Sequence, residues 1–131
     1  MSDQFENTLL SNLIHNEEFT RKALPFIKAD FFKGRNEVTL FNLINDFVIK
    51  YNNLPTKEAL SIELSNLKTL TEDEFKNVKE LLNGLQHEEV EQQWLLDTTE
   101  KFCKDRAVHN AVLDGIKILD GKDKKRTPEA I

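Results

Sequence analysis

The most continuous hydrophobic pattern of the chain runs from about Val90 to Leu119, with no proline and a first glycine at Gly115. Apolar and small side chains recur there every three or four residues, as on one face of an α-helix. This stripe consists of Leu95, Thr98, Phe102, His109, Val112, Ile116 and Leu119, widened by Trp94, Cys103, Ala107, Val108 and Ala111. Thirty helical residues span about 45 Å, whereas the roughly 90 other residues form a globule with a radius of gyration of about 12 Å. The long helix is therefore predicted to project beyond the globule and to need an apolar partner.

Five shorter helices are predicted before it, in the segments 3–14, 16–24, 36–51, 56–67 and 71–85. Asp3 with Glu6, and Thr71 with Glu74, fit the capping box, in which two side chains three residues apart satisfy backbone N–H groups of the first turn. Asn16 fits an N-cap, because two glutamates follow it in the first turn of the second helix. Capping signals and helical spacing thus agree over most of the chain.

The connector over residues 25–35 is unusually apolar for a loop between helices. It contains four large apolar side chains: Phe26, Ile27, Phe31 and Phe32. Leaving all four in solvent would lose the free energy that their burial provides. We expect this connector to fold back over the core.

Together these elements predict an all-α fold, with a small orthogonal globule of about five helices over residues 1–88 and the long helix within residues 89–131. Four glycines are too few for the many tight turns of a β-rich architecture. Thr127, Pro128 and Glu129 form a helix-start signal. Because a helix beginning there is expected to continue past Ile131, we interpret the sequence as part of a longer protein.

Charge and cysteine content narrow the function classes. The formal net charge of -5 argues against a nucleic-acid-binding module, which needs an excess of lysine and arginine. The single cysteine, Cys103, excludes an internal disulfide framework and is consistent with a reducing cytoplasm. The sequence lacks an apolar run of 18 residues and a signal-peptide pattern at its start, so we expect a cytoplasmic chain with no membrane partner.

Few residues suggest chemistry. His15, His87 and His109 lie on separate predicted elements without metal-ligand spacing, and solvent-facing or interfacial histidines are the favoured interpretation. Cys103 is expected to be a buried, unreactive thiol. A glycine-rich phosphate loop is absent from the sequence. We therefore predict no catalytic, cofactor or metal site here, and a small enzyme is the least supported hypothesis.

Two further features suggest binding. Trp94, the single tryptophan, opens the long helix; packing onto the globule is slightly favoured over a role as an exposed partner anchor. A basic run near the C-terminus is a possible phosphate contact, although a solvated turn is the favoured interpretation. The run consists of Lys122, Lys124, Lys125 and Arg126.

The order of these elements resembles the N-terminal domain of DnaB-type hexameric replicative DNA helicases, in the branch found in tailed phages. The resemblance rests on the segments ENTLLSNLIHNEEFTRKALPFI, ADFFKGRNEVTLFNLI, NNLPTKEAL and KFCKDRAVHNAVLDGIKILDG. Within them, the residues that match the family pattern are Asp30, Phe31, Phe32, Phe41, Ile44, Arg106, Ala107 and Val108. Asn53 stands where the family usually has glycine.

The resemblance implies a helical globule followed by a helical hairpin, whose first arm is the long helix and whose second arm begins near residue 127. It implies that the hairpins pair into dimers and that the dimers form the collar of a hexameric ring. Primase and a helicase loader are the implied partners in the primosome. ATP, magnesium and most DNA contacts belong to a motor domain outside this sequence, so the fragment itself is not expected to be an enzyme.

For subunit pairing, the predicted interface residues are Phe102, Val108, His109, Val112, Ile116 and Leu119. An alternative hypothesis remains open: a free-standing helical adaptor, or a protein like a helicase loader, that binds replication proteins or single-stranded DNA.

Overall fold

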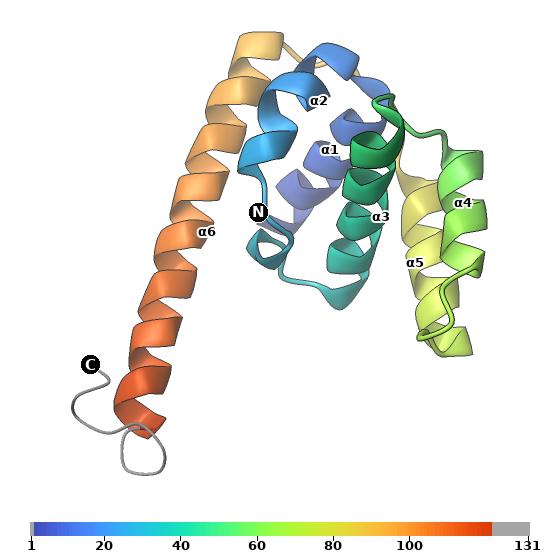
Figure 1. Ribbon diagram of the computed structural model, residues 1–131. Helices are drawn as coiled ribbons and strands as arrows, with labels where there is room; N and C mark the ends of the chain where they lie inside the picture. The colour runs from blue at the N-terminus through green and yellow to red at the C-terminus, as the bar shows by residue number, and fades with distance from the viewer. Residues whose placement is uncertain (1, 122–131) are drawn as a thin grey trace.

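The computed structural model describes the backbone of residues 2–121 and the side chains of residues 4–117. Over this range the chain forms six α-helices and two short 3-10 turns (Figure 1). The all-α prediction is confirmed. The elements are α1 (Ser2–His15), α2 (Glu17–Ala23), η1 (Leu24–Phe26), η2 (Ala29–Phe31), α3 (Arg35–Tyr51), α4 (Lys57–Ser65), α5 (Glu72–Gly84) and α6 (Gln92–Gly121).

Two of the three predicted caps are confirmed. Asn16 accepts from the Phe19 N–H at 3.1 Å and begins α2. At the start of α5, Thr71 and Glu74 form the reciprocal capping box, with bonds of 3.1 and 3.0 Å. The predicted cap at Asp3 and Glu6 is wrong, because α1 already begins at Ser2. The Glu6 carboxylate accepts from the Lys33 N–H and from a side chain of α6.

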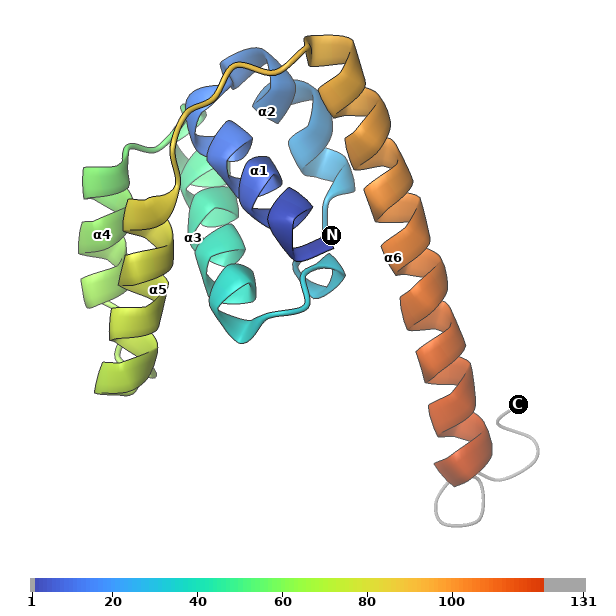
Figure 2. The ribbon, with the colours of Figure 1, turned by 180° about the vertical axis from the view of Figure 1, so that it is seen from behind.

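Helix α1 occupies the middle of the globule. It packs against α2 and α3, while α3 also packs against the pair α4 and α5. Helix α6 lies on the side of the molecule opposite α4 and α5, as the views from front and back agree (Figure 2). The completely buried apolar side chains of the described residues come from every helix: Leu9, Leu10, Leu13, Phe19, Leu40, Ile44, Leu60, Leu64, Leu82 and Leu95.

The apolar connector returns to the core, as the sequence predicted, with one exception. Ile27, Phe31 and Phe32 are each at most 6% exposed and belong to the core cluster. Phe26 is 73% exposed, so the prediction is wrong for this residue. It closes the 3-10 turn η1 right after Pro25, and that turn leaves its ring outside while its neighbour Ile27 is inside.

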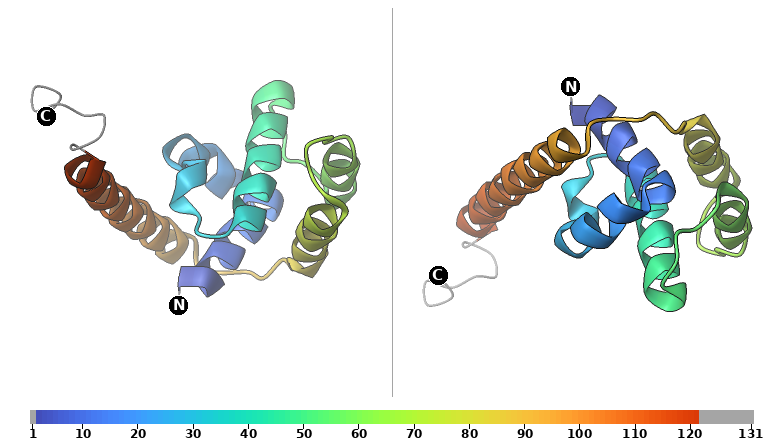
Figure 3. Two further views of the ribbon diagram at one scale, coloured as in Figure 1. Left: turned by 90° about the horizontal axis from the view of Figure 1, so that it is seen from below. Right: turned by 90° about the horizontal axis from the view of Figure 1, so that it is seen from above.

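Helix α6 begins two residues later than the sequence indicated and continues to Gly121. Its first half lies beside α2 and η2. Its second half extends past the globule, as views along a perpendicular direction also show (Figure 3). None of the helices within residues 2–121 combines the length and the apolar character that crossing a bilayer requires. The helix-start signal at residues 127–129 lies outside the described residues.

Candidate protein-docking surfaces

A buried ion pair fixes α6 to the globule. The Arg106 guanidinium donates to the Glu6 carboxylate at 3.0 Å, and the two side chains are only 10% and 2% exposed. The same guanidinium donates to the Phe31 carbonyl oxygen at 2.5 Å. Its charged carbon lies 4.8 Å from the centre of the Phe102 ring. Arg106 therefore connects α6, α1 and η2 at one buried point.

The Glu6 carboxylate has two partners but remains costly to ionise. It accepts from the Lys33 N–H at 3.2 Å in addition to Arg106. Burial raises the pKa of Glu6 above its usual value, and these two partners offset only part of that effect. Because a buried charge without its partner is strongly destabilising, Glu6 and Arg106 must be retained or lost together. This pair is the anchor of α6.

Among the side chains that the structure describes, the last polar contact between α6 and the globule lies one turn further along. The Asn110 side-chain amide donates to the Asp30 carbonyl oxygen at 3.0 Å. From position 111 to position 117 every residue is exposed. Eleven residues separate Asn110 from the helix end at Gly121, which corresponds to about 16 Å of projecting helix.

This projecting half carries apolar side chains in solvent. Val108, Val112 and Ile116 are 63%, 56% and 48% exposed. Because they follow one another at intervals of four residues, they form one line along the helix, with Leu113 beside it. We call Val108, Val112 and Ile116 the distal stripe. Exposed apolar side chains gathered in this way are typical of an association surface.

The other residues predicted for the interface lie elsewhere. Phe102 is only 8% exposed and packs against the rings of Phe5 and Phe32, so it is a core residue and the structure separates it from the stripe. Phe102 precedes Val108 by six residues, which places the two roughly 120° apart around the helix axis. His109 is exposed. The side chain of Leu119 and the basic residues 122–126 lie outside the part that the structure describes.

Trp94 combines both interpretations that the sequence left open. Its ring packs edge-on against Phe5, with 6.3 Å between ring centres, yet the residue is 48% exposed. Its backbone N–H is capped by the Glu91 carboxylate at 2.7 Å. The indole is therefore held in place and still offers half of its surface to a partner.

Two grooves flank α6. One, of about 560 Å³, lies between α1, α5 and the connector that leads to Trp94. The other, of about 510 Å³, lies between α2, η1 and α6, and is lined mainly by apolar groups that include the exposed Phe26. Cys103 also lines this second groove. Burial raises the pKa of the Cys103 thiol to about 11, which makes it a poor nucleophile at neutral pH.

The structure brings together two of the three histidines. The rings of His15 and His87 lie 5.2 Å apart, centre to centre. Among the described residues, however, histidine, cysteine and carboxylate side chains do not gather in the threes that a metal site needs. Over this part of the chain the geometry supports docking surfaces.

Sequence reasoning missed the anchor and the first groove. Arg106 lies four residues after Phe102 and eleven after Leu95, hence on the buried face of α6. A charged residue in a buried stripe signals a hidden partner. Its partner Glu6 is 100 residues away, which spacing along the chain does not reveal.

Comparison with known proteins shows that this chain is similar to a phage helicase. The chain is 32% identical over 110 residues, or 84% of its length, to a DnaB-like replicative helicase of Enterobacteria phage T4. It spans 23% of the length of that helicase. No protein-family model matches the chain. The resemblance to phage DnaB-type helicases that the sequence motifs indicated is confirmed by this relative.

Proposed function

From its relation to a DnaB-like replicative helicase, we propose that this chain is the N-terminal assembly and partner-docking domain of such an enzyme. The domain carries out no chemistry itself; ATP and magnesium would bind in a motor domain further along the protein. The distal stripe is the observation that supports this proposal best. In water, three exposed aliphatic side chains in one line gain free energy by being covered.

The proposed arrangement is a pairing of projecting helices between subunits. The buried anchor at Arg106 fixes the first half of α6, which we call its root, to the globule. The projecting end of α6 therefore extends from the globule in a fixed direction. Two such ends could pair through their stripes by knobs-into-holes packing. A second copy of the same surface is a natural partner, because closed dimers use the same patch on both subunits. Repetition of such pairs in a hexameric ring, and docking of primase and a helicase loader on the globules, complete the proposal.

The test is the oligomeric state of the full-length protein. Replacing Val112→Asp and Ile116→Asp together places two charges in the proposed contact, and we expect the assembly to dissociate by at least one step in sedimentation velocity. Circular dichroism should stay unchanged, because both side chains are exposed in the monomer.

A matched control is Lys117→Asp, which changes the net charge by the same two units as the two aspartates of the double variant. Lys117 is exposed and lies roughly 140° around the helix from the middle of the distal stripe. If the control and the double variant dissociate the assembly equally, or neither does, the pairing proposal is wrong.

A free-standing adaptor or loader-like protein is the competing proposal, because the matched region is only 23% of the helicase relative. The reading frame beyond Ile131 distinguishes the two. We expect a nucleotide-binding Walker motif within roughly the next hundred residues, as one RecA-like motor domain would require. A stop codon directly after Ile131 would favour the adaptor.

A further inference from the structure

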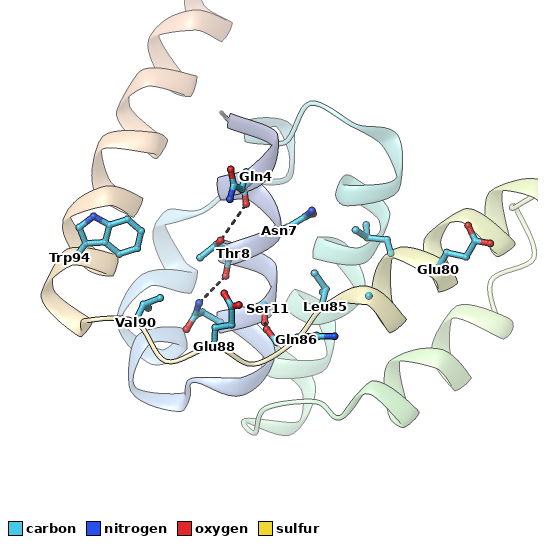
Figure 4. A pocket seen from close by; sticks show the side chains of 13 residues that line it. Gln4, Asn7, Thr8, Ser11, Glu80, Leu85, Gln86, Glu88, Val90 and Trp94 are labelled. Carbon is cyan, nitrogen blue, oxygen red and sulfur yellow. Dashed lines mark hydrogen bonds between the residues drawn. The ribbon is translucent and has the colours of Figure 1, made fainter.

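The groove between α1 and α5 is lined by apolar, uncharged polar and acidic side chains. It measures about 560 Å³, within the range of well-formed binding sites. The connector from Leu85 to Glu91 forms one border, and Figure 4 shows the groove extending from Trp94 at one end toward Glu80 at the other. Trp94 is the residue of α6 that lines it, so the groove lies at the opposite end of α6 from the distal stripe.

One wall of this groove is apolar. Leu81, Leu85, Val90 and the exposed half of Trp94 line it. Leu85 is already buried, whereas Trp94 remains 48% exposed. A fixed, half-exposed indole beside aliphatic side chains is the kind of site where binding energy concentrates at protein interfaces.

The wall formed by α1 is polar but uncharged. Gln4 and Asn7 are exposed and lie three residues apart on one face of α1. Further along, Ser11 donates to the Gln86 carbonyl oxygen at 2.5 Å and holds the connector in place. Side-chain amides both donate and accept hydrogen bonds, so Gln4 and Asn7 match the N–H and C=O groups of a peptide backbone.

The charges at the groove are negative. Glu80 and Glu88 are exposed and are the charged side chains among the described residues that line it. The nearby Lys57 ammonium donates hydrogen bonds to the Asn83 and Leu85 carbonyl oxygens at the end of α5. Two carboxylates repel phosphate groups and attract cationic side chains. Nucleic acid is therefore disfavoured as the occupant.

We propose that this groove binds a basic, amphipathic peptide segment of a partner protein. Apolar side chains of the segment would cover Trp94 and the half-buried Val90, and a lysine or arginine would reach Glu80 or Glu88. This inference rests on the proposed docking function and specifies the chemistry of one partner.

Trp94 supplies the measurement, because it is the single tryptophan of the chain. The full-length protein, with any tryptophan outside this chain replaced by phenylalanine, is titrated with a tryptophan-free twelve-residue peptide of lysine and leucine at helical spacing. We expect a blue shift of the Trp94 emission that weakens as salt is added. The matching glutamate–leucine peptide and a twelve-nucleotide oligo(dT) should leave the emission unchanged. An equal response to either of these two would overturn the proposal.

Matched variants distinguish binding in the groove from attraction to the net negative charge of the protein. Glu80→Gln with Glu88→Gln should weaken binding of the basic peptide by about tenfold or more. Glu58→Gln with Glu63→Gln removes the same charge from α4, whose described residues do not line the groove, and should leave the affinity unchanged. Equal weakening in the two double variants would show that the peptide senses only net charge, and the groove would be excluded.

The result of the peptide titration is independent of the result of the assembly test for the proposed function. Val112→Asp with Ile116→Asp should dissociate the assembly without changing the peptide titration. If the assembly behaves as proposed but the basic peptide fails to bind, this inference alone is wrong. If the peptide binds but the reading frame lacks a motor domain, the helicase proposal is wrong and the groove stands as the docking site of an adaptor.

Discussion

The two halves of α6 differ in what covers them, although they belong to one continuous helix. In the root, Leu95, Phe102 and Arg106 are each at most 8% exposed. In the projecting end, Val108, Val112 and Ile116 are each about half exposed or more. The same spacing of apolar residues thus serves the core in one half and an open surface in the other. Helical periodicity identifies an apolar face but does not identify the partner of that face.

The largest effect is expected at the anchor. Replacing Arg106→Met leaves the Glu6 carboxylate buried without a cation, and we expect a loss of about 3–5 kcal/mol in the free energy of unfolding at neutral pH. Urea denaturation measures this loss. The control Lys104→Met removes an exposed ion pair with Glu100 on the same helix and should cost under about 1 kcal/mol. Equal losses in the two variants would contradict the anchor.

The loss at Arg106 should depend on pH in a defined direction. Burial already raises the pKa of Glu6 in the folded protein above its ordinary value of 4.5, and removal of Arg106 raises it further. Since the folded state then binds the proton more tightly than the unfolded state, stability rises as the pH falls through the folded pKa toward 4.5. The difference between variant and parent should therefore shrink at acid pH. A difference that stays constant from neutral pH to pH 4.5 would show that Glu6 is not the uncompensated charge.

A smaller effect is expected from truncating an apolar side chain, and only in the root. Phe102→Ala removes a buried ring and should cost about 3 kcal/mol, at the low end for large core truncations because the ring lies at the edge of the core. Val112→Ala, measured in the monomer, should change stability by at most about 0.5 kcal/mol. Thermal or urea unfolding at low protein concentration measures both. A large loss from Val112→Ala in the monomer would place the distal stripe in the core.

The smallest effect is expected at the boundary between the two halves. Asn110→Ala removes one hydrogen bond to the Asp30 carbonyl oxygen and should cost about 0.5–1 kcal/mol. Asp114→Ala, at an exposed position one turn further along, is the control and should change stability less. If Asn110→Ala has no effect on stability, the stabilising contact between α6 and the globule ends before this turn.

The sequence predicts local structure well here because the signals are local. Asn16, Thr71 and Glu74 cap the helices that their positions indicate, since the bonds that they form span three residues. Helical spacing also locates α6. These features need no knowledge of which elements meet in space.

The prediction fails where a residue's partner comes from another element. Glu6 fits a local cap, but its carboxylate accepts from Arg106, a hundred residues away. Phe26 and Ile27 look equivalent in sequence, and only the turn at η1 separates an exposed ring from a buried side chain. The groove at Trp94 is likewise formed by α1, α5 and a connector, so its polar wall from α1 and its apolar wall meet only in the folded chain.

Hydrogen–deuterium exchange along α6 tests the central claim most directly. In the full-length protein, amides of residues 95–106 should be protected at every protein concentration, because the globule covers them. Amides of residues 108–116 should exchange quickly in dilute protein and become protected as the protein assembles. Protection of residues 108–116 that is already complete in the monomer, or that never appears in the assembly, would contradict the account.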